Sequence, residues 1–315
     1  MLAPEFAYLN GRIIPWDDAK VHVFSPVAKY GIGVFEGIRG YWNEHVQQLY
    51  LFRVAEHLER YAFSQKAMRF DRAVSSNALI DSIIHLCRAN AFRTTVHIRL
   101  MAFIDGAGEL AAKGPVGTAI TALPRKTTRQ SIEGAAAHIS SWMRIPDNVM
   151  PARIKCNANY HNARLAMMQA QLDGYDVAFL LNSRGKLAEA PAMCVFMVRD
   201  GQLITPSGTN DILESITRQT VIQLGREYLG VDTIERDVDR TELILAQEVF
   251  YCGTGAEITP VTSVDRMVVG CGQPGPITRQ LIDIYRAIAT GNNTAHERWR
   301  TPVFCNTDYA QDGSS

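Results

Sequence analysis

From residue 135 onwards the sequence alternates between stretches typical of β-strands and stretches typical of amphipathic helices. The strand patterns are short runs rich in β-branched and aromatic residues, and the helical patterns place apolar residues three and four positions apart. Strands are expected at 135–140, 176–181, 193–198, 231–237 and 248–252, and helices at 160–172, 216–228, 240–247 and 277–289. Because such a chain covers a sheet with helices, the alternation predicts a mixed α/β fold.

The region before residue 124 combines antiparallel β-structure with two helices. Asn10-Gly11 separates two short apolar runs, which predicts a hairpin with a type I′ turn. Another strand is expected at 46–52, and helices are expected at 55–68 and 77–87. This half of the chain is therefore expected to form a smaller α/β domain that begins with antiparallel strands.

A polar, positively charged stretch, PRKTTRQS, lies at 124–131 and is the best candidate for a linker. We therefore predict a first domain at 1–123, an interdomain linker at 124–134 and a larger domain at 135–315. Within the larger domain, the stretch from Gly291 to Ser315 is expected to be loosely ordered.

Charge and cysteine usage restrict the partners and the compartment. The 32 Lys and Arg residues balance 32 Asp and Glu residues among 315, so nothing favours nucleic acid or an anionic membrane as a partner. The start lacks the pattern of a secretion signal, no apolar run is long enough to span a membrane, and a cytoplasmic location is expected. The six cysteines form no C-x-x-C pair, which fits reduced thiols better than disulfides or a zinc site, and we expect no metal.

Two glycine clusters, at 31–37 and 253–255, are candidates for nucleotide binding, but neither has the required spacing. The first is one residue too long for a dinucleotide fingerprint, and the second lacks the third glycine. The sequence also has no Walker A, H-E-x-x-H or G-x-S-x-G motif. Nucleotide hydrolysis, zinc protease and α/β-hydrolase functions therefore have no support.

Phosphate can also bind at the start of a helix, where backbone N–H groups are unpaired. Ser215-Ile216-Thr217-Arg218 opens the helix expected at 216–228, with Ser215 as a plausible N-cap. Gly253-Thr254 offers a second hydroxyl and flexible backbone. An ordinary capped helix is the simpler interpretation of this segment taken alone.

Two basic residues have unusual surroundings. Lys155 is one of only seven lysines, and it stands just before a predicted helix, with Tyr160 five residues later. A lysine in such a position is a weak indication of Schiff-base chemistry, although a lone lysine is usually a surface charge. Arg99 lies on the apolar, alternating strand expected at 94–104, either as a rim arginine that reaches water or as an anion-binding arginine in a cleft.

Taken together and in order, these motifs resemble those of the branched-chain amino acid aminotransferases, which are fold type IV enzymes that depend on pyridoxal 5′-phosphate (PLP). The resemblance spans most of the chain. The segments that carry it are 20–23 (KVHV), 30–39 (YGIGVFEGIR), 56–60 (EHLER), 153–160 (RIKCNANY), Glu189, 213–218 (LESITR) and 253–261 (GTGAEITPV). It implies two domains with the cofactor between them, the domain at 135–315 being the large cofactor-binding one.

The resemblance also implies roles for individual residues toward the cofactor. Lys155 would carry PLP as a Schiff base and shuttle a proton during the reaction. Glu189 would pair with the pyridine nitrogen and keep it protonated, so that the ring can accept electrons. Tyr160 would hydrogen-bond the phenolic oxygen, and Leu213 would pack beneath the ring. The phosphate would be bound by Arg60, Ile216, Thr217 and Thr254.

For the substrate, the resemblance implies transfer of an amino group from L-leucine, L-isoleucine or L-valine to 2-oxoglutarate in a ping-pong cycle. Arg99 would bind the distal carboxylate of glutamate, and apolar side chains would use the same pocket without it. Family members are homodimers or larger, and the loop equivalent to 105–110 reaches the neighbouring site. The residues implied to contact substrate are Tyr30, Phe35, Gly37, Arg39, His97, Arg99, Thr254 and Gly255.

Several departures from the family pattern affect the expected pocket. The family reads E-G-x-G-x-N where this chain has EAPAMC at 189–194, so both glycines and the asparagine are replaced. His97 stands at a tyrosine position, Ser215 stands at a glycine position, and the linker is shortened. We expect cofactor binding to persist, the pocket to be reshaped near 190–194 and the donor or acceptor preference to shift.

Two other functions stay open. One is a different fold type IV activity: D-amino acid transamination, aminodeoxychorismate lyase chemistry, or transamination of an unusual amino acid in specialised metabolism. The other is a non-catalytic dimer that keeps PLP as a structural ligand.

Overall fold

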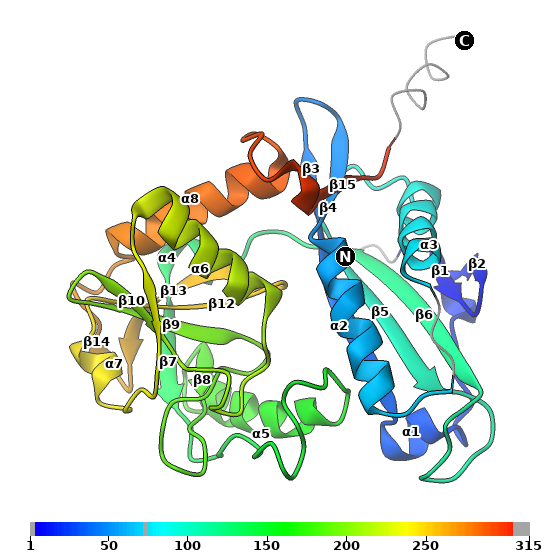
Figure 1. Ribbon diagram of the computed structural model, residues 1–315, viewed down its shortest axis with the longest axis horizontal. Coiled ribbons are helices and arrows are strands. Elements are labelled where there is room, and N and C mark those ends of the chain that lie inside the picture. The colour runs from blue at the N-terminus through cyan, green and yellow to red at the C-terminus, as the bar shows by residue number, and fades with distance from the viewer. Residues whose placement is uncertain (1–3, 72–74, 305–315) are drawn as a thin grey trace. The chain divides into compact units, whose positions relative to one another are not determined.

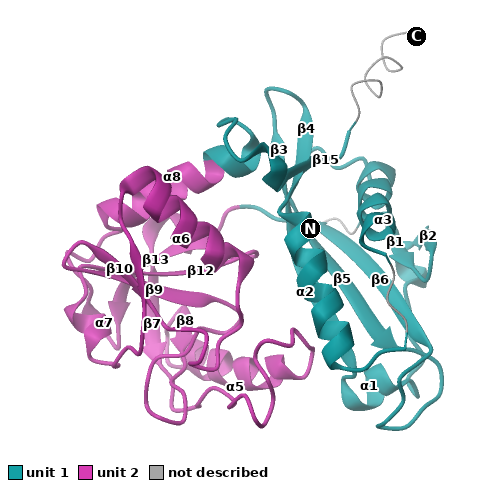
Figure 2. Ribbon diagram, in the orientation of Figure 1, with its two compact units in different colours: residues 1–126, 287–315 teal, residues 127–286 magenta. Residues whose placement is uncertain are grey.

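The computed structural model describes residues 4–71 and 75–304. The chain forms two compact units, and each is built around its own sheet (Figure 2). The first unit contains the residues up to Lys126 together with those from Ala287 on, and the second runs from Thr127 to Arg286. A mixed α/β architecture is therefore present in both units.

The first unit is built on a seven-stranded antiparallel sheet with the order β15-β4-β3-β5-β6-β1-β2. Its opening hairpin confirms the prediction from Asn10-Gly11, because both residues have positive φ, 49° and 92°. The strands are β1 (Phe6–Leu9), β2 (Arg12–Pro15), β3 (Gly33–Asn43), β4 (Gln48–Phe52), β5 (Val96–Ile104), β6 (Val116–Pro124) and β15 (Arg300–Pro302).

The helices α2 (Val54–Ala67) and α3 (Ser76–Ala89) pack against this sheet, while α1 (Pro26–Tyr30) contacts β5 (Figure 1). The alternation along β5 is as predicted: Ile98 and Leu100 are fully buried, whereas Arg99 is exposed. Glu36, which pairs with Leu100 across the strands, is bonded to side chains of α2. The helices therefore cover the face that carries Ile98 and Leu100.

The second unit is built on a mixed sheet of eight strands, in the order β11-β10-β9-β12-β13-β7-β8 with β14 beside β13. The pairs β10 with β11, β13 with β7 and β7 with β8 are parallel, and the others are antiparallel. The strands are β7 (Ala135–Ile139), β8 (Val177–Phe179), β9 (Cys194–Arg199), β10 (Gln202–Thr205), β11 (Thr233–Glu235), β12 (Glu248–Gly253), β13 (Glu257–Val264) and β14 (Met267–Val268).

Five helices accompany this sheet. They are α4 (Gln130–Glu133), α5 (Asn159–Leu172), α6 (Ile216–Leu229), α7 (Glu242–Leu245) and α8 (Pro276–Thr290). Three of them lie close to the helices expected at 160–172, 216–228 and 277–289, whereas the helix expected at 240–247 is shortened to the four residues of α7. The core beside the sheet contains Val195, Met197, Val249 and Val261, all at most 3% exposed. No helix in the described ranges is both long and apolar enough to cross a membrane.

The unit boundaries differ from the predicted domains at both ends. The chain passes from the first unit to the second after Lys126, and α4 occupies part of the stretch predicted as a linker. The chain returns to the first unit within α8, so the residues from Ala287 on belong to the first unit and not to the predicted larger domain. The physical reason is the pairing of β15 with β4 in the first sheet.

The expectation of a loosely ordered tail from Gly291 is wrong for its described part. Residues 297–299 form a short helical turn, η2 (Glu297–Trp299), and β15 follows it directly. Trp299 is 3% exposed and packs edge-on against Phe52, at 6.0 Å between ring centroids. Residues 305–315, which were also predicted to be loose, lie outside the described residues.

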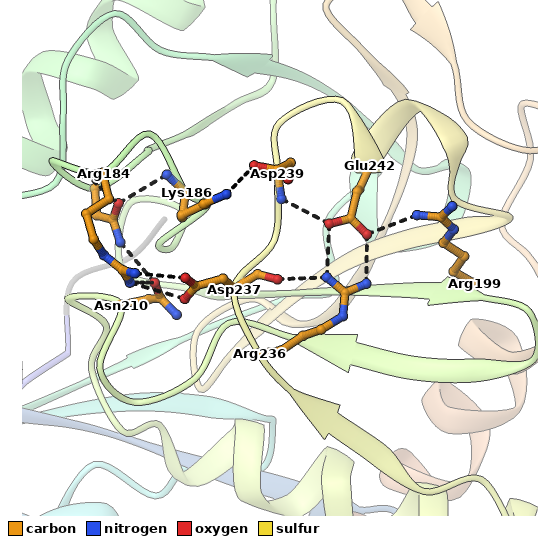
Figure 3. Close-up of polar contacts among 9 residues, drawn as sticks. Arg184, Lys186, Arg199, Asn210, Arg236, Asp237, Asp239 and Glu242 are labelled. Carbon is orange, nitrogen blue, oxygen red and sulfur yellow. Dashed lines mark hydrogen bonds and ion pairs between the residues drawn. The ribbon is translucent and has the colours of Figure 1, made fainter.

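A network of ion pairs holds the connection from β11 to α7 against the second sheet (Figure 3). Glu242, the first residue of α7, accepts hydrogen bonds from Arg236 at 2.9 and 2.7 Å and from Arg199 at 3.0 Å. The backbone N–H of Asp239 also donates to Glu242, and the Asp239 carboxylate accepts from Lys186. One carboxylate therefore joins three segments of the unit.

Candidate active site

Lys155 lies in the second unit, between β7 and α5. Its Nζ donates a hydrogen bond of 2.7 Å to the hydroxyl of Tyr160, which lies in the first turn of α5. Asn159 fixes the same segment by donating to the carbonyl oxygens of Pro151 and Ile154, both at 3.0 Å. The structure therefore brings Lys155 and Tyr160 together at a half-buried position.

Arg153 ties the lysine segment to the loop that carries Leu213. Its Nε donates to Glu214 at 2.8 Å, and its Nη2 donates to the carbonyl oxygen of Gly208 at 2.8 Å. Because Arg153 is two residues from Lys155, these bonds restrict the position of the lysine backbone relative to the 208–214 loop.

Glu189 is buried and sits between two hydrogen-bond donors. Its Oε1 accepts from the Nε of Arg144 at 2.8 Å, and its Oε2 accepts from the backbone N–H of Leu213 at 3.0 Å. Burial raises the pKa of the Glu189 carboxyl, while Arg144, the Leu213 N–H and the charge of Lys155 act in the opposite direction. The structure thus places Glu189 with Leu213 and within electrostatic range of Lys155.

Sequence reasoning did not identify Arg144. The only signal is an arginine between apolar neighbours, Met143 and Ile145, in the same stretch as Lys155. That signal is too common to single out a residue without the fold, because its partner Glu189 lies 45 positions later.

The predicted anion site at the start of α6 has the expected local structure. Ser215 caps the helix, and its hydroxyl accepts from the N–H of Arg218 at 3.3 Å. Ile216 and Thr217 follow as the first two residues of the helix, a position from which backbone N–H groups can donate to a group outside the helix. Thr254 and Gly255 lie in the turn between β12 and β13, and α6 packs against β12.

The turn before β9 is where this chain departs from the family pattern. Ala190 and Met193 exchange backbone hydrogen bonds of 2.8 and 3.0 Å, and Ala192 has a φ of +67°. Ala190 is packed in the hydrophobic core of the unit. A Cβ on Gly253 would lie 3.2 Å from the Ala192 carbonyl oxygen, so this turn supports the backbone next to Thr254.

In the first unit, the residues implied to contact substrate gather on two neighbouring strands. Gly37 pairs with Arg99 and Arg39 pairs with His97 across β3 and β5, so their side chains share one face of the sheet. The Arg99 guanidinium lies 4.1 Å from the ring centroid of Phe35 on the same face. A Cβ at Gly37 would come within 3.0 Å of the His97 ring, which explains the glycine there.

Tyr30 ends α1, and its hydroxyl donates to Glu109 at 3.0 Å. Lys29 also donates to the carbonyl oxygen of Gly108 at 2.7 Å. The 105–110 loop is therefore bonded to α1 of its own chain, while the side chain of Leu110 is 70% exposed.

Arg60, predicted to bind phosphate, forms a two-point ion pair with the fully buried Glu36 at 2.7 and 2.8 Å. His57 also contacts this carboxylate at 2.7 Å. Burial alone would raise the pKa of Glu36, but Arg60 and His57 lower it to about 2. Arg60 thus has a structural partner on the helix-covered face of the sheet, which the sequence did not predict.

With this fold and this site, comparison with known proteins assigns the chain to a family. The family model for amino-transferase class IV matches residues 33–264, and the protein belongs to that family. Among its relatives are a probable branched-chain-amino-acid aminotransferase of Aquifex aeolicus, 37% identical over 95% of this chain and 97% of that protein, and the branched-chain-amino-acid aminotransferase of Escherichia coli K12, 35% identical over 95% and 97%.

Solved structures agree. The PLP form of the branched-chain amino acid aminotransferase from Thermobaculum terrenum is 44% identical, with a TM-score of 0.91, over 97% of this chain and 100% of that one. The enzyme from Thermoproteus uzoniensis with norvaline is 38% identical, with a TM-score of 0.91, over 96% and 100%. The fold is therefore the class IV aminotransferase fold, as predicted.

Class IV aminotransferases use PLP, and the residues present fit this cofactor. The second unit supplies a primary amine held by a phenol, a buried carboxylate able to accept from a ring nitrogen, and the capped start of a helix that suits a phosphate. All three groups belong to the second unit and are held in place by contacts within that unit.

Proposed function

We propose that this protein transfers the amino group of L-leucine, L-isoleucine or L-valine to 2-oxoglutarate through PLP in a ping-pong cycle. The observation that carries the proposal is the hydrogen bond between Lys155 and Tyr160 in the same site as the buried Glu189. The names of the relatives, at 35–44% identity over nearly the whole chain, support the choice of substrate.

Bound PLP supplies a ring that withdraws electrons from the substrate carbon. Lys155 anchors the cofactor and then carries the proton at the substrate Cα through its Nζ. Tyr160, 2.7 Å from that Nζ, orients the amine. Glu189 would accept a hydrogen bond from the ring N–H, and Leu213 would pack against the ring. Ile216 and Thr217 at the start of α6 would hold the phosphate together with Thr254, and the resemblance assigns the same role to Arg60 of the first unit.

We also propose that side chains of the first unit contact the substrate. Phe35 offers an apolar surface, and Arg99 beside it offers a cation for the distal carboxylate of glutamate. Tyr30, Gly37, Arg39 and His97 of the same unit would also contact the substrate, and in the second unit the backbone at Thr254 and Gly255 would bind the α-carboxylate. Phe35 and Arg99 would accept a branched side chain or a carboxylate in alternate half-reactions.

The direct test is the visible absorption of the bound cofactor before and after the separate addition of L-leucine, L-glutamate and D-alanine. We expect L-leucine and L-glutamate to bleach it and D-alanine to leave it unchanged. Bleaching by D-alanine alone would assign the protein to D-amino acid transamination, and a band indifferent to all three would favour the non-catalytic alternative.

Lys155→Ala gives a second test. We expect it to remove all transamination while the far-ultraviolet circular dichroism stays that of the unmodified protein, because the lysine is only half-buried. Tyr160→Phe is the matched control: it removes only the hydroxyl that orients the amine, and it should reduce the rate without abolishing it. Turnover retained by Lys155→Ala would refute the role of the lysine.

We also propose a homodimer. The support is a group of exposed apolar side chains in the first unit, Val23 at 82%, Phe24 at 53% and Leu110 at 70%, near a loop already bonded to α1. Sedimentation velocity should give twice the chain mass, and Leu110→Asp should weaken the assembly. A monomer at micromolar concentration would contradict it.

We propose a cytoplasmic location because the five cysteines in the described part of the chain are free, as expected in a reducing compartment. Recovery of the protein with secreted or periplasmic fractions would contradict this.

A further inference from the structure

Arg144 is a buried cation held against the carboxylate of Glu189. Its backbone N–H donates to the carbonyl oxygen of Leu181 at 2.8 Å, its side chain is 7% exposed, and its Nε donates to Glu189 at 2.8 Å. Because Leu213 occupies the other carboxylate oxygen, the two protein donors restrict the rotation of the carboxyl group. Glu189 is therefore oriented before any ligand binds.

The pair is not arranged for stability alone. The Nη1 of Arg144 is buried and has no hydrogen-bond partner among the residues that the structure describes. A guanidinium stays charged under all ordinary conditions, and an unused buried donor costs free energy. Buried ion pairs seldom stabilise a fold more than apolar residues of similar size do. The position of this charge therefore requires another explanation.

We propose that Arg144 is a positioning residue which, through Glu189, keeps the proton shared between that carboxylate and the ring nitrogen of the cofactor on the nitrogen. The inference rests on the proposed use of PLP by this site. Moving the proton from the ring to Glu189 would bring positive charge toward the guanidinium 2.8 Å behind the carboxylate, and the repulsion opposes that transfer.

The burial of Glu189 makes this assistance necessary. Burial raises the pKa of the Glu189 carboxyl and so favours its neutral form. A neutral carboxyl group does not attract a protonated ring nitrogen electrostatically as a carboxylate does. The charge of Arg144 lowers this pKa more strongly than the Leu213 N–H or Lys155 does. Lys155 lends its amine to the cofactor in the proposed function, and Arg144 then remains the constant cation beside Glu189.

The test compares Arg144→Met with Arg144→Lys, both loaded with PLP that carries an isotope label at the ring nitrogen. Nuclear magnetic resonance of that nitrogen reports its protonation in the resting protein, without any substrate. We expect a protonated nitrogen in the unmodified protein, a shift toward the unprotonated signal in Arg144→Met, and recovery of most of the protonated signal in Arg144→Lys. A protonated signal retained in Arg144→Met would overturn the proposal.

Activity provides a second readout. Arg144→Met should lower kcat roughly 10–100-fold, the range typical of residues that orient a primary ligand, with little change in KM. Arg184→Met is the matched control, since Arg184 also pairs with a carboxylate, Asp237, but at an exposed site. It should leave both the nitrogen signal and kcat unchanged.

A double-mutant cycle keeps the proposal testable if Arg144→Met folds poorly. In Glu189→Gln no buried carboxylate is left unpaired, so adding Arg144→Met should change neither the nitrogen signal nor kcat further. A further tenfold loss in the double variant would show that Arg144 acts by another route, and would overturn the proposal. Failure of the proposed function is separate, because it would appear in the unmodified protein as a cofactor that no amino donor bleaches.

Discussion

At the scale of single residues, Ala192 stands out because its backbone has a left-handed conformation that favours glycine. It follows Pro191 in a tight turn closed by Ala190 and Met193, and positive φ at the third position of such a turn is the geometry for which glycine is preferred. The family pattern has glycine at this position, so the chain has kept the turn and replaced its best residue.

We therefore expect Ala192→Gly to stabilise the protein by about 0.5–1 kcal/mol, because relief of the unfavourable φ outweighs the added freedom of the unfolded chain. Urea denaturation measures this. Ala190→Gly is the control, since Ala190 is fully buried in the core and its loss should destabilise by a similar amount. If Ala192→Gly destabilised the protein as Ala190→Gly is expected to do, the explanation from the positive φ would be contradicted.

Arg99 offers a residue-scale test of substrate choice. Arg99→Ala should lower kcat/KM for L-glutamate and 2-oxoglutarate at least tenfold and for L-leucine much less, because only the former carry a second carboxylate. Arg99→Lys keeps the charge but not the planar contact with Phe35. Its kcat/KM for L-glutamate should therefore lie between that of the unmodified protein and that of Arg99→Ala. The measurement is a kinetic comparison of the three substrates. Equal losses for all three would contradict the proposal that Arg99 binds the distal carboxylate.

Residue identities in the site were predictable where chemistry restricts the residue type. Ser215 caps α6 as predicted, and Lys155 lies within hydrogen-bond distance of Tyr160, while the roles implied for Lys155, Tyr160 and Leu213 toward the cofactor stay predictions. Arg144 and the bond between Arg60 and Glu36 were not predictable, because each depends on which buried side chains meet after folding.

At the scale of elements, the β11 to α7 connection depends on one carboxylate. The hydrogen bond from Arg236 is the first cause that lowers the pKa of Glu242, to about 2 in the folded protein. The unfolded value is about 4.3, so the stabilisation is fully present above that pH and is lost as the pH falls toward 2.

Glu242→Gln should therefore lower the free energy of unfolding by about 1 kcal/mol at pH 7, because the ion pairs with Arg236 and Arg199 are partly exposed. The difference from the unmodified protein should shrink as the pH falls below about 4. Denaturation at several pH values tests this. Asp232→Asn, in an almost fully exposed pair with Arg226, should show no such trend.

Most helices and strands could be predicted from periodicity, but three strands of the second sheet were missed: β10, β13 and the two-residue β14. β13 contains Pro260, which pairs with Phe250, and a proline argues against an interior strand in the sequence. β10 has only four residues, and its signal was the preceding Asp200-Gly201 turn, where both φ values are positive. The failure to predict β13 has a physical reason, whereas β10 could have been predicted from the Asp200-Gly201 turn.

At the scale of the whole molecule, the first unit is assembled from two separate stretches of chain. Trp299 joins them: its ring stacks on His296 at 3.9 Å, meets Phe52 edge-on and lies under the guanidinium of Arg53. Sequence patterns are local, so they could not show that residues near 300 complete a sheet formed around residue 50.

Trp299→Ala should destabilise the first unit by about 3–5 kcal/mol, the usual cost of removing a buried tryptophan. Hydrogen exchange should show lost protection in β4 and unchanged protection in β9, because the two strands belong to different units. Trp142→Ala, at a position 43% exposed, is the control and should cost under about 1 kcal/mol. Loss of protection in both units would contradict their separation.

The pairing of β15 with β4 also sets an order of events on the ribosome. Residues 127–286 emerge as a continuous stretch and have all their strands available before residues 300–302 are made. Until then β4 has no neighbour on one side, and an unpaired strand edge is a site for association with other nascent chains. Synthesis of this enzyme thus contains an interval in which the first sheet is incomplete, and binding of a chaperone to nascent chains should be strongest during that interval.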